Sequence, residues 1–447
     1  MLQLLTKSLK QFHKGGVHPP ESKLSAHAPI TDLELPESVN IPISQHIGAP
    51  ASVVVERGDM VKVGQVIAVH EGFVSSNIHS SVSGKVGRID KMMDSSGFKR
   101  VAINIRVKGD DWDESIDRTD TLIKDISFTS EEIVKKIMEA GVVGMGGAAF
   151  PSHVKLTVPE GKHVDTLIVN GVECEPYLTA DHRLMLEKPH EIMIGTQILM
   201  KSLGVDRDTI GIENNKGDAI ALLSSIARDY PGIEVEALRV QYPQGGEKQL
   251  IEALLGREVP SGGLPSDVGA IVHNVGTIYS MYLAVQKNQP LIERVVTVTG
   301  RNVAKPSNFK VRIGTPVINL IEAAGGLPDG TGKVVSGGPM MGKALNDITV
   351  PIAKATSGIL VIPIEESNRE QVYPCVQCGK CIASCPMGLE PRDLMNLSLH
   401  KDLEGAKQAH VMDCLECGSC SFICPSNRPI LDYIRMSKTK IKKMPRS

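Results

Sequence analysis

The chain has few aromatic residues, little net charge and no long apolar run. Aromatic side chains make up 3% of its 447 residues, and its formal net charge is −2. This balance provides no overall basic field to attract nucleic acid, and few flat surfaces on which bases could stack. We therefore expect no nucleic-acid partner.

No stretch approaches the roughly 20 apolar residues that a membrane-spanning helix needs. Residues 1–16, MLQLLTKSLKQFHKGG, have neither the long apolar core nor the small-residue cleavage site of a signal peptide. We expect a chain that folds in the cytosol and reaches a membrane only by docking onto a partner.

Cysteine is scarce too, but it is concentrated near one end. Eight of the nine cysteines form two copies of one pattern, C-x2-C-x2-C-x3-C-P. This spacing lets a tight loop direct three thiolates at one [4Fe–4S] cube, so the doubled pattern predicts two cubes. The copies are Cys375, Cys378, Cys381 and Cys385, then Cys414, Cys417, Cys420 and Cys424.

In two-cluster ferredoxins, the fourth cysteine of each motif ligates the other cluster. We therefore predict that one cluster is held by Cys375, Cys378, Cys381 and Cys424, and the other by Cys414, Cys417, Cys420 and Cys385. A pair of zinc ribbons is an alternative, but such sites prefer paired CxxC knuckles. Disulfides are disfavoured in a reducing compartment. Two neighbouring clusters predict that single electrons pass through the protein.

Residues 41–107 alternate short β-runs with glycine turns. They resemble the barrel-sandwich hybrid of lipoyl and biotinyl carriers, which present a lysine on an exposed hairpin. Residues 71–81 contain no lysine. The resemblance therefore implies a scaffold of that shape rather than a covalent carrier.

The rest of the chain divides into segments that differ in their expected secondary structure. Residues 129–287 alternate strands and helices, which predicts a parallel sheet covered on both faces, with ligands at the carboxyl ends of its strands. Residues 294–364 contain short strands and one helix, and resemble the β-grasp module called SLBB. We predict a multidomain α/β plus α+β chain. Its domains are a barrel-sandwich hybrid at 1–125, the parallel-sheet domain at 126–290, the β-grasp module at 291–365 and a ferredoxin-like twin-cluster helical domain at 366–447.

A glycine-rich loop, GVVGMGGAAFPSHVK, occupies residues 141–155. Gly144, Gly146 and Gly147 leave a bare backbone that a planar ring or a phosphate can approach closely. The spacing formally fits the dinucleotide fingerprint, but that motif must follow a strand. A helix is expected before this loop, so an ordinary Rossmann site is rejected. A helix end with a tight turn would explain two of the glycines, but hardly the run of small residues followed by Phe150 and Lys155.

Two more loops follow predicted strands. LIVNGVECEPYLTADHR ends a buried strand at Asn170 and carries Glu173, Glu175 and Asp181 beyond it. Acidic groups at such a position suit ribose hydroxyls or a nicotinamide amide. A solvated turn is the alternative, weakened by the cysteine and proline among the acids. VQYPQGGEKQL repeats the order of strand, Tyr242, glycines, Glu247 and helix.

The three loops resemble those of the flavin- and NADH-binding subunit of respiratory complex I, which read GxGGAxFP and N-x-x-E-x-E-P. The resemblance implies that FMN is bound by Gly144, Gly146, Lys155, Asn170 and Glu173. It places Tyr242, Gly245 and Thr277 nearby, with Gly147 leaving room for the flavin. Phe150, Glu175 and Glu247 would face NADH. Two residues depart from the pattern: Met145 stands where complex I has arginine, and Val172 where it has aspartate.

The order of these segments resembles the C subunit of the Rnf electron transport complex, from about Phe12 to beyond Pro425. Typical segments are FHKGGVHPPESK, MGGAAFPSHVK, NGVECEPY and CVQCGKC. The resemblance implies a peripheral subunit on the cytoplasmic face of a membrane-bound complex that couples ferredoxin and NAD to ion translocation. Electrons would pass between NAD(H), FMN and two [4Fe–4S] clusters. The implied partners are the other Rnf subunits, NADH, and ferredoxin through a partner subunit.

Three rival interpretations follow from the same residues. A passive electron-wiring subunit without flavin is kept open by Met145 and Val172. The A subunit of the sodium-pumping quinone reductase shares the N-terminal region but lacks a twin-cluster tail. GGPMMGKA fits the spacing of a phosphate-binding loop, but Ala344 replaces the hydroxyl residue that binds magnesium, which disfavours nucleotide hydrolysis.

Overall fold

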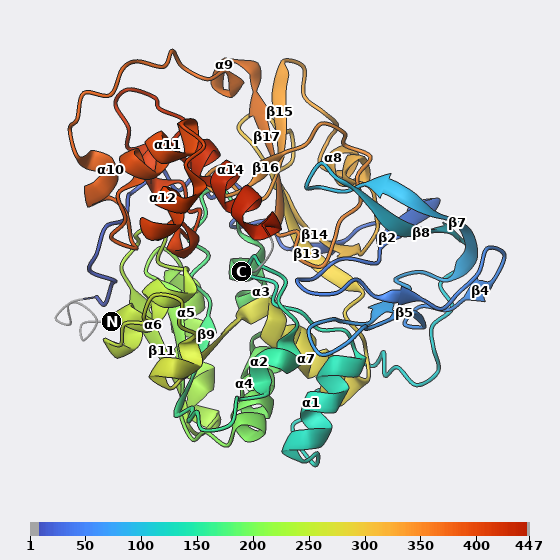
Figure 1. Ribbon diagram of the computed structural model, residues 1–447. Helices are drawn as coiled ribbons and strands as arrows, with labels where there is room; N and C mark the ends of the chain where they lie inside the picture. Colours follow the sequence, from blue (N-terminus) through green and yellow to red (C-terminus); the bar gives the residue numbers. More distant parts are fainter. Residues whose placement is uncertain (1–8, 445–447) are drawn as a thin grey trace.

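The computed structural model describes residues 9–444 and contains a four-stranded parallel sheet in the order β11-β10-β9-β12 (Figure 1). The strands are β9 (Thr166–Asn170), β10 (Asp208–Glu213), β11 (Ile233–Leu238) and β12 (Ala270–Asn274). Leu167 and Val169 pack into one hydrophobic core, whereas Ile168 between them packs into another. Because both faces of the central strand β9 are buried, its residues from Leu167 to Val169 are apolar in succession. The predicted parallel sheet is confirmed.

Helices pack against this sheet. The larger core receives α1 (Ser130–Glu139), α4 (Pro189–Leu203) and α7 (Val275–Lys287), and the smaller core receives α6 (Glu247–Leu255). The remaining helices of this α/β domain are α2 (Ser152–Leu156), α3 (Ala180–Glu187), α5 (Gly217–Ile226) and the 3-10 turns η2 (Ala227–Asp229) and η3 (Pro265–Val268). Phe12, from the N-terminal segment, is fully buried in the smaller core.

The barrel-sandwich hybrid consists of two small sheets around one core. One sheet has the order β2-β8-β7-β4 and the other β3-β5-β6, with every pairing antiparallel. The strands are β2 (Ser38–Pro42), β3 (Ser52–Val53), β4 (Met60–Val61), β5 (Val66–Val69), β6 (Ile78–His79), β7 (Gly84–Met93) and β8 (Lys99–Val107). Apolar residues from both sheets, including Ile41, Ile67 and Ile103, are fully buried between them. This confirms the predicted scaffold.

The β-grasp module is a six-stranded sheet in the order β1-β14-β13-β17-β15-β16. The bounds are β13 (Glu293–Thr299), β14 (Ser307–Arg312), α8 (Val317–Ala323), β15 (Thr331–Ser336), β16 (Lys343–Ala344), β17 (Gly358–Pro363) and α9 (Ile364–Ser367). Its edge strand β1 (Ile30–Asp32) comes from the N-terminal segment and runs parallel to β14. The sequence did not predict this added strand.

The cluster module is helical. It contains α10 (Lys380–Ala383), α11 (Pro391–Leu399), α12 (Leu403–Gln408), η4 (Val411–Asp413), α13 (Ser419–Phe422) and α14 (Ile430–Lys443). The segment between the two cysteine motifs forms two helices, α11 and α12, rather than one continuous helix. Lys401 adopts a φ of +59°, and the Asp402 side chain accepts a hydrogen bond from the Gly405 amide to start α12. The positive φ breaks the helical ladder, and the cap begins a second helix.

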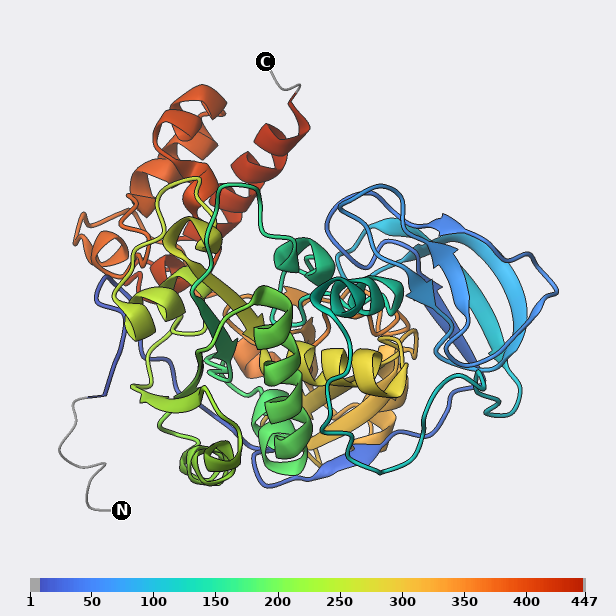
Figure 2. The same ribbon diagram turned by 90° about the horizontal axis from the view of Figure 1, so that it is seen from below.

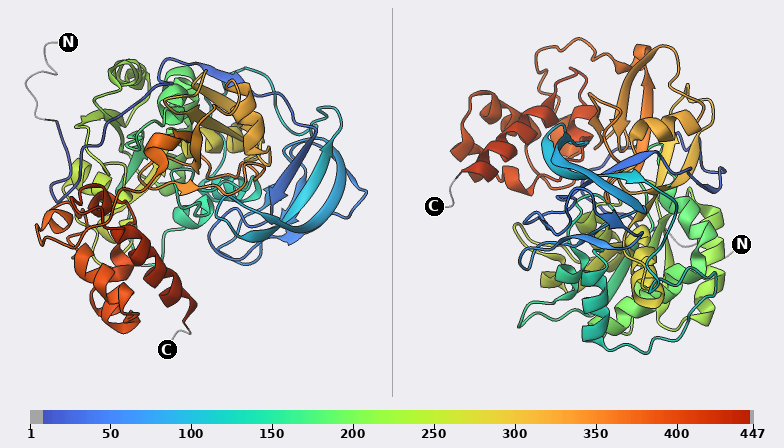
Figure 3. Two further views of the ribbon diagram at one scale, coloured as in Figure 1. Left: turned by 90° about the horizontal axis from the view of Figure 1, so that it is seen from above. Right: turned by 90° about the vertical axis from the view of Figure 1, so that its right-hand side faces the viewer.

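The barrel-sandwich hybrid and the cluster module lie on opposite sides of the molecule, with the α/β domain and the β-grasp module between them (Figures 2 and 3). Within residues 9–444 we find no helix with the length and apolar character required to cross a bilayer. Residues 1–8, part of the segment judged not to be a signal peptide, lie outside the described range.

Candidate functional site

The glycine-rich loop follows α1, as the sequence predicted. Thr129 and Glu132 form a reciprocal capping box at the start of this helix, and Gly141 follows its end with a φ of +65°. The loop then folds back, because the Gly144 amide donates to the Phe150 carbonyl at 2.8 Å. The Met145 amide donates to the Thr277 hydroxyl at 2.9 Å, which joins the loop to α7. The predicted residues Gly144, Phe150 and Thr277 therefore lie together.

Gly146, Gly147 and Ala148 are exposed at the tip of the loop. A Cβ added to Gly146 would lie 3.2 Å from the Cβ of Asn274, whereas one added to Gly147 would meet open space. Gly147 carries the positive φ, +148°. Gly146 itself does not have a positive φ. Gly146 approaches the end of β12, and Gly147 leaves a bare backbone on the outside.

Four predicted residues meet at the carboxyl ends of the parallel strands. Lys155 forms an ion pair with Glu247 and donates to the Val272 carbonyl at 2.7 Å. The Asn170 side-chain amide donates to the Gly245 carbonyl at 2.9 Å. Carboxyl ends of parallel strands are where α/β proteins bind ligands. The glycine-rich loop, the β9 loop and the β11 loop thus converge on one edge.

The acidic loop after β9 turns its two glutamates in different directions. Glu173 accepts hydrogen bonds from the amides of Asp181 and His182, at 2.8 and 3.1 Å, in the first turn of α3. A carboxylate there satisfies unpaired amides and the helix dipole.

Glu175 leaves the sheet edge and contacts the β-grasp module. It accepts hydrogen bonds from the amides of Met340 and Met341, at 3.3 and 2.7 Å. Burial raises the pKa of Glu175 to about 7, although these two amides and the charges of Lys23 and Arg435 act in the opposite direction. The loop that holds it, between β15 and β16, is the one that mimicked a phosphate-binding motif. The next element is the strand β16 and not a helix, so this loop lacks the strand-to-helix arrangement of a phosphate-binding loop.

Lys23 is a residue of this site that the sequence did not indicate. Its ammonium group donates to the carbonyls of Glu173, Glu175 and Leu178, at 2.8, 2.9 and 2.7 Å. Burial, followed by repulsion from Lys216, lowers the pKa of Lys23 to about 8. In the sequence, the segment PPESK, which ends at Lys23, indicated only a family resemblance. The residues that Lys23 contacts lie 150 or more positions further along the chain.

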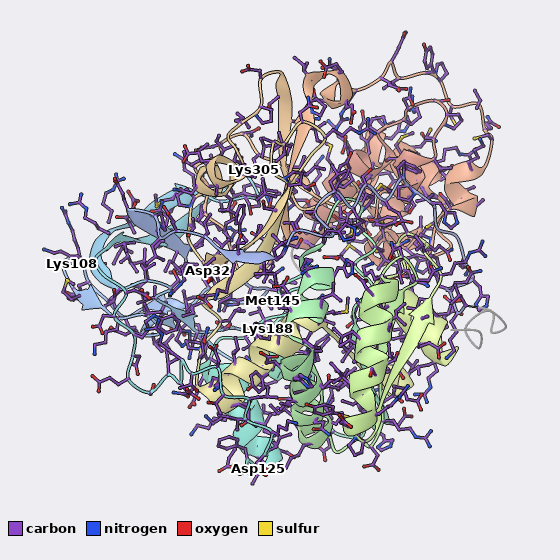
Figure 4. All side chains as sticks on the ribbon, turned by 180° about the vertical axis from the view of Figure 1, so that it is seen from behind. Asp32, Lys108, Asp125, Met145, Lys188 and Lys305 are labelled. Carbon is purple, nitrogen blue, oxygen red and sulfur yellow. The ribbon has the colours of Figure 1, made fainter. Side chains whose placement is uncertain are left out.

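Met145, the residue that replaces arginine, is buried behind the glycine-rich loop. Its carbonyl accepts a hydrogen bond from Arg294 at 3.3 Å, and Met145 lines a cavity of about 680 Å³. Asp32 and Lys188 line the same cavity, and Figure 4 shows all three on the back of the molecule. Val172, the other departure, is fully buried in the smaller core of the α/β domain.

The cluster module encloses a second, smaller cavity. Its lining includes Cys414, Cys417 and Cys420 of the second motif together with Cys385 of the first. Burial raises the pKa of the Cys420 thiol to about 12, with added repulsion from the other three thiols. Across residues 9–444, no set of three His, Cys, Asp or Glu side chains is arranged to hold a metal ion. The four thiols nonetheless share one cavity, so Cys385 lies with the second motif, as crossed ligation requires.

The first motif is more open. Cys375 and Cys378 are exposed, and Cys424 of the second motif is close enough to Cys381 to contribute to the rise in its pKa, which burial dominates. The two motifs have the same backbone conformation, since Gln377 and Glu416 have φ values of +54° and +59° at equivalent positions. Gly379 and Gly418 follow with +71° and +82°. These left-handed residues form the tight turns between the cysteines.

The cluster module is fastened to the α/β domain at the second motif. The Tyr242 hydroxyl donates to the Cys417 carbonyl at 2.8 Å, and Tyr242 is 2% exposed. Lys438 donates to the Cys414 carbonyl at 2.6 Å and pairs with Glu416. Arg435 pairs with Glu416 and donates to the Met341 carbonyl at 3.3 Å. One network thus joins the Tyr242 loop, the second cysteine motif and the loop that holds Glu175.

Four family models match the chain, in the order of its domains. The RnfC barrel sandwich hybrid domain matches residues 10–110, and the Nuo51 FMN-binding domain residues 137–283. The SLBB domain matches residues 295–344, and the 4Fe-4S dicluster domain residues 368–438. The predicted fold class is confirmed. The domain boundaries at 125, 290 and 365 stay predictions.

A solved structure shares the fold. The chain aligns with a crystal structure of an NAD+-reducing [NiFe]-hydrogenase in the air-oxidized state, with a TM-score of 0.51 and 18% identity. The alignment covers 71% of this chain and 68% of that one.

Curated relatives match along nearly the whole length. The C subunit of the proton-translocating ferredoxin:NAD(+) oxidoreductase complex of Clostridium ljungdahlii is 47% identical over 96% of this chain and 94% of its own. The Na(+)-translocating counterpart of Acetobacterium woodii is 44% identical over 86% and 87%. The C subunit of the ion-translocating oxidoreductase complex of Rhodobacter capsulatus is 41% identical over 96% and 83%. The chain belongs to the RnfC family, the C subunits of ion-translocating ferredoxin:NAD(+) oxidoreductase complexes.

Proposed function

We propose that this chain is the NAD(H)-handling subunit of a membrane-bound complex that couples electron transfer between ferredoxin and NAD to ion translocation. It binds FMN and two [4Fe–4S] clusters and works as part of an oxidoreductase. The relatives named above supply the reaction and the other Rnf subunits as partners, with ferredoxin reached through one of them. The observation that carries the proposal is the Tyr242–Cys417 hydrogen bond, which fastens a predicted flavin loop to a cysteine motif.

Two features of the glycine-rich loop and of α2 support the flavin assignment. The exposed backbone of Gly146 and Gly147 allows close approach, and the Lys155 ammonium is a cation for a phosphate. We assign FMN to Gly144, Gly146, Gly147, Lys155, Asn170, Glu173, Tyr242, Gly245 and Thr277. Phe150, Glu175 and Glu247 are assigned to NADH. A flavin, when bound, takes two electrons from NADH and passes them on one at a time to one-electron carriers such as iron–sulfur clusters.

We assign the eight thiols of the two motifs to two cubes. Cys385, Cys414, Cys417 and Cys420 line one cavity, and we assign them to an inner cluster, next to Tyr242. Cys375, Cys378, Cys381 and Cys424 are assigned to an outer cluster. Because Cys375 and Cys378 are exposed, the outer cluster faces a redox partner. The chain docks on the cytoplasmic face of the membrane through other subunits.

The chain purified without oxygen tests this proposal. We expect bound FMN, about eight irons by the two-cube assignment, and loss of the oxidised flavin absorbance when NADH is added. The reduced-cluster signal in electron paramagnetic resonance should follow. Clusters without flavin, and no reduction by NADH, would instead support a passive wiring subunit. The Lys155–Glu247 ion pair favours that rival, because it neutralises the cation proposed to meet the phosphate.

A further inference from the structure

The N-terminal strap, defined as residues 10–25, contacts three parts of the chain in succession. In Figure 1 it is the blue segment that climbs beside the α/β domain toward the cluster module. At its start, Phe12 is fully buried beside Leu238 and Leu250, and its amide donates to Gln244. The amide of His13 donates to Glu252 on α6 at 3.1 Å. The first part of the strap is therefore anchored in the α/β core.

The middle of the strap joins the cluster module to the Tyr242 loop. The Gly16 amide donates to the carbonyl of Ser384, the neighbour of Cys385, at 2.9 Å. Val17 and Tyr242 exchange two backbone hydrogen bonds, of 2.8 and 2.9 Å. The Val17 side chain packs with Tyr242 and Cys417 in one small hydrophobic cluster. Two consecutive residues thus hold a proposed cluster loop and a proposed flavin loop together.

The glycines of this contact leave no room for a side chain. Gly15 has a φ of +77°, and a Cβ there would lie 2.6 Å from the carbonyl carbon of Cys385. Gly16 has a φ of +91°, and its Cβ would lie 2.6 Å from the Gln241 side-chain amide. The positive φ therefore requires glycine at both positions, and the close approach to Cys385 also requires it at Gly15.

The end of the strap fixes the acidic loop. Lys23 donates to the carbonyls of Glu173, Glu175 and Leu178, all within 2.9 Å. The hydroxyls of Ser25 and Thr179 lie 2.6 Å apart. A single ammonium with three carbonyl partners restrains the whole turn, since breaking its bonds leaves several polar groups unsatisfied.

We propose that the N-terminal strap is a positioning element for electron transfer, which holds the Cys385 loop and the acidic loop at fixed places against the Tyr242 loop. The inference rests on the proposed function. The strap's own residues contact neither electron carrier in this scheme. They set the gap between the flavin and the inner cluster, and electron transfer slows steeply as such a gap widens.

Gly15→Ala tests the strap, with Gly72→Ala as the matched control. Gly72 has a φ of +75°, and a Cβ there would meet nothing within 4 Å. Both substitutions carry the same backbone strain, but only Gly15→Ala pushes on Cys385. After mixing with NADH, flavin absorbance and the reduced-cluster signal are followed separately. We expect Gly15→Ala to slow cluster reduction by about tenfold or more, or to lose only the inner cluster, while flavin content and flavin reduction stay unchanged. Gly72→Ala should match the wild type.

Lys23→Met is the second variant and decides the matter if Gly15→Ala fails to fold. It keeps the length of the side chain and removes the donors to the acidic loop. We expect slower flavin-to-cluster transfer with the full iron content. If both variants fold, a wild-type rate of cluster reduction in both would overturn the strap's role. If Gly15→Ala does not fold, a wild-type rate of cluster reduction in Lys23→Met would overturn it. Absence of flavin or of NADH-driven reduction in the wild type would overturn the proposed function instead, so the two failures are distinguishable.

Discussion

The hydroxyl of Tyr242 donates a hydrogen bond to the backbone carbonyl of Cys417, 175 positions further along the chain and 2.8 Å away. Tyr242 lies in the loop after β11, and Cys417 lies in the second cysteine motif. Burial raises the pKa of the Tyr242 hydroxyl well above its usual range, so it stays a donor at physiological pH. The two modules proposed to exchange electrons therefore share a buried, neutral contact.

Tyr242→Phe should destabilise the chain by about 1 kcal/mol, the usual net worth of a buried hydrogen bond. The ring still fills its place, and the Cys417 carbonyl loses its donor. Chemical denaturation under anaerobic conditions measures the change. Tyr373→Phe is the control, because the Tyr373 hydroxyl bonds to Gln371 at an exposed site. We expect its effect to stay within about 0.5 kcal/mol. Equal effects of the two variants would show that the Cys417 contact is weak.

Pairs of cysteine substitutions test crossed ligation. Cys385→Ser combined with Cys417→Ser removes two ligands of the same proposed cluster, so about four irons should remain of about eight. Cys385→Ser combined with Cys378→Ser damages both proposed clusters, so fewer irons should remain. Iron and acid-labile sulfide analysis measures the difference. If more irons remain in the pair with Cys378→Ser than in the pair with Cys417→Ser, each motif holds its own cluster and the ligation is not crossed.

Cys174→Ser is the control for the cysteine series. Cys174 lies on the acidic loop and accepts a hydrogen bond from the Gly245 amide at 3.4 Å. Cys174 packs against the small hydrophobic cluster that contains Cys417, but it does not line the cavity that the four thiols share, so its loss should leave the full iron content. A fall by about four irons would make Cys174 a ligand.

Gly146→Val should abolish FMN binding and NADH oxidation while both clusters remain. The new side chain points toward Asn274, which caps α7 at the edge where the three loops meet. Flavin fluorescence and iron analysis are read on the same sample, with circular dichroism as the check on folding. A folded variant that keeps its flavin and oxidises NADH with an artificial acceptor would show that the loop is only a turn.

Glu175→Gln should weaken NADH binding more than flavin binding. The carboxylate is held by the amides of Met340 and Met341, so its loss loosens the acidic loop on the side of the β-grasp module. Two titrations, one with NADH and one with FMN, measure the difference. Lost flavin with unchanged NADH affinity would exchange the roles assigned to Glu173 and Glu175.

The same residue predicts a pH dependence of stability. The pKa of Glu175 is raised from 4.5 to about 7 in the folded chain, mainly by burial. Between these values the folded state binds more protons than the unfolded state, so the free energy of unfolding falls as the pH rises through this window. Denaturation of wild type and Glu175→Gln at several pH values isolates this contribution. In this pH window, the free energy of unfolding of the variant should fall less with rising pH than that of the wild type. The same dependence on pH in both proteins would contradict the raised pKa of Glu175.

The sequence by itself determined the cluster module, the parallel sheet and the three loops at its edge. Each depends on local patterns: the spacing of Cys375 to Cys385, the alternation of strands and helices, and the bare backbone of Gly144 to Gly147. A spacing or a periodicity is visible in the order of residues because its physical cause acts over a few neighbouring positions.

The tertiary structure decided the contacts between distant segments. Lys23 meets the acidic loop, β1 joins β14, and Glu175 turns to the β-grasp module. Gly15 and Gly16 lie against Cys385 and Gln241, more than two hundred positions away. Such contacts depend on how separately folded cores pack, and a lone lysine or glycine pair carries no local signal of the partner it will meet.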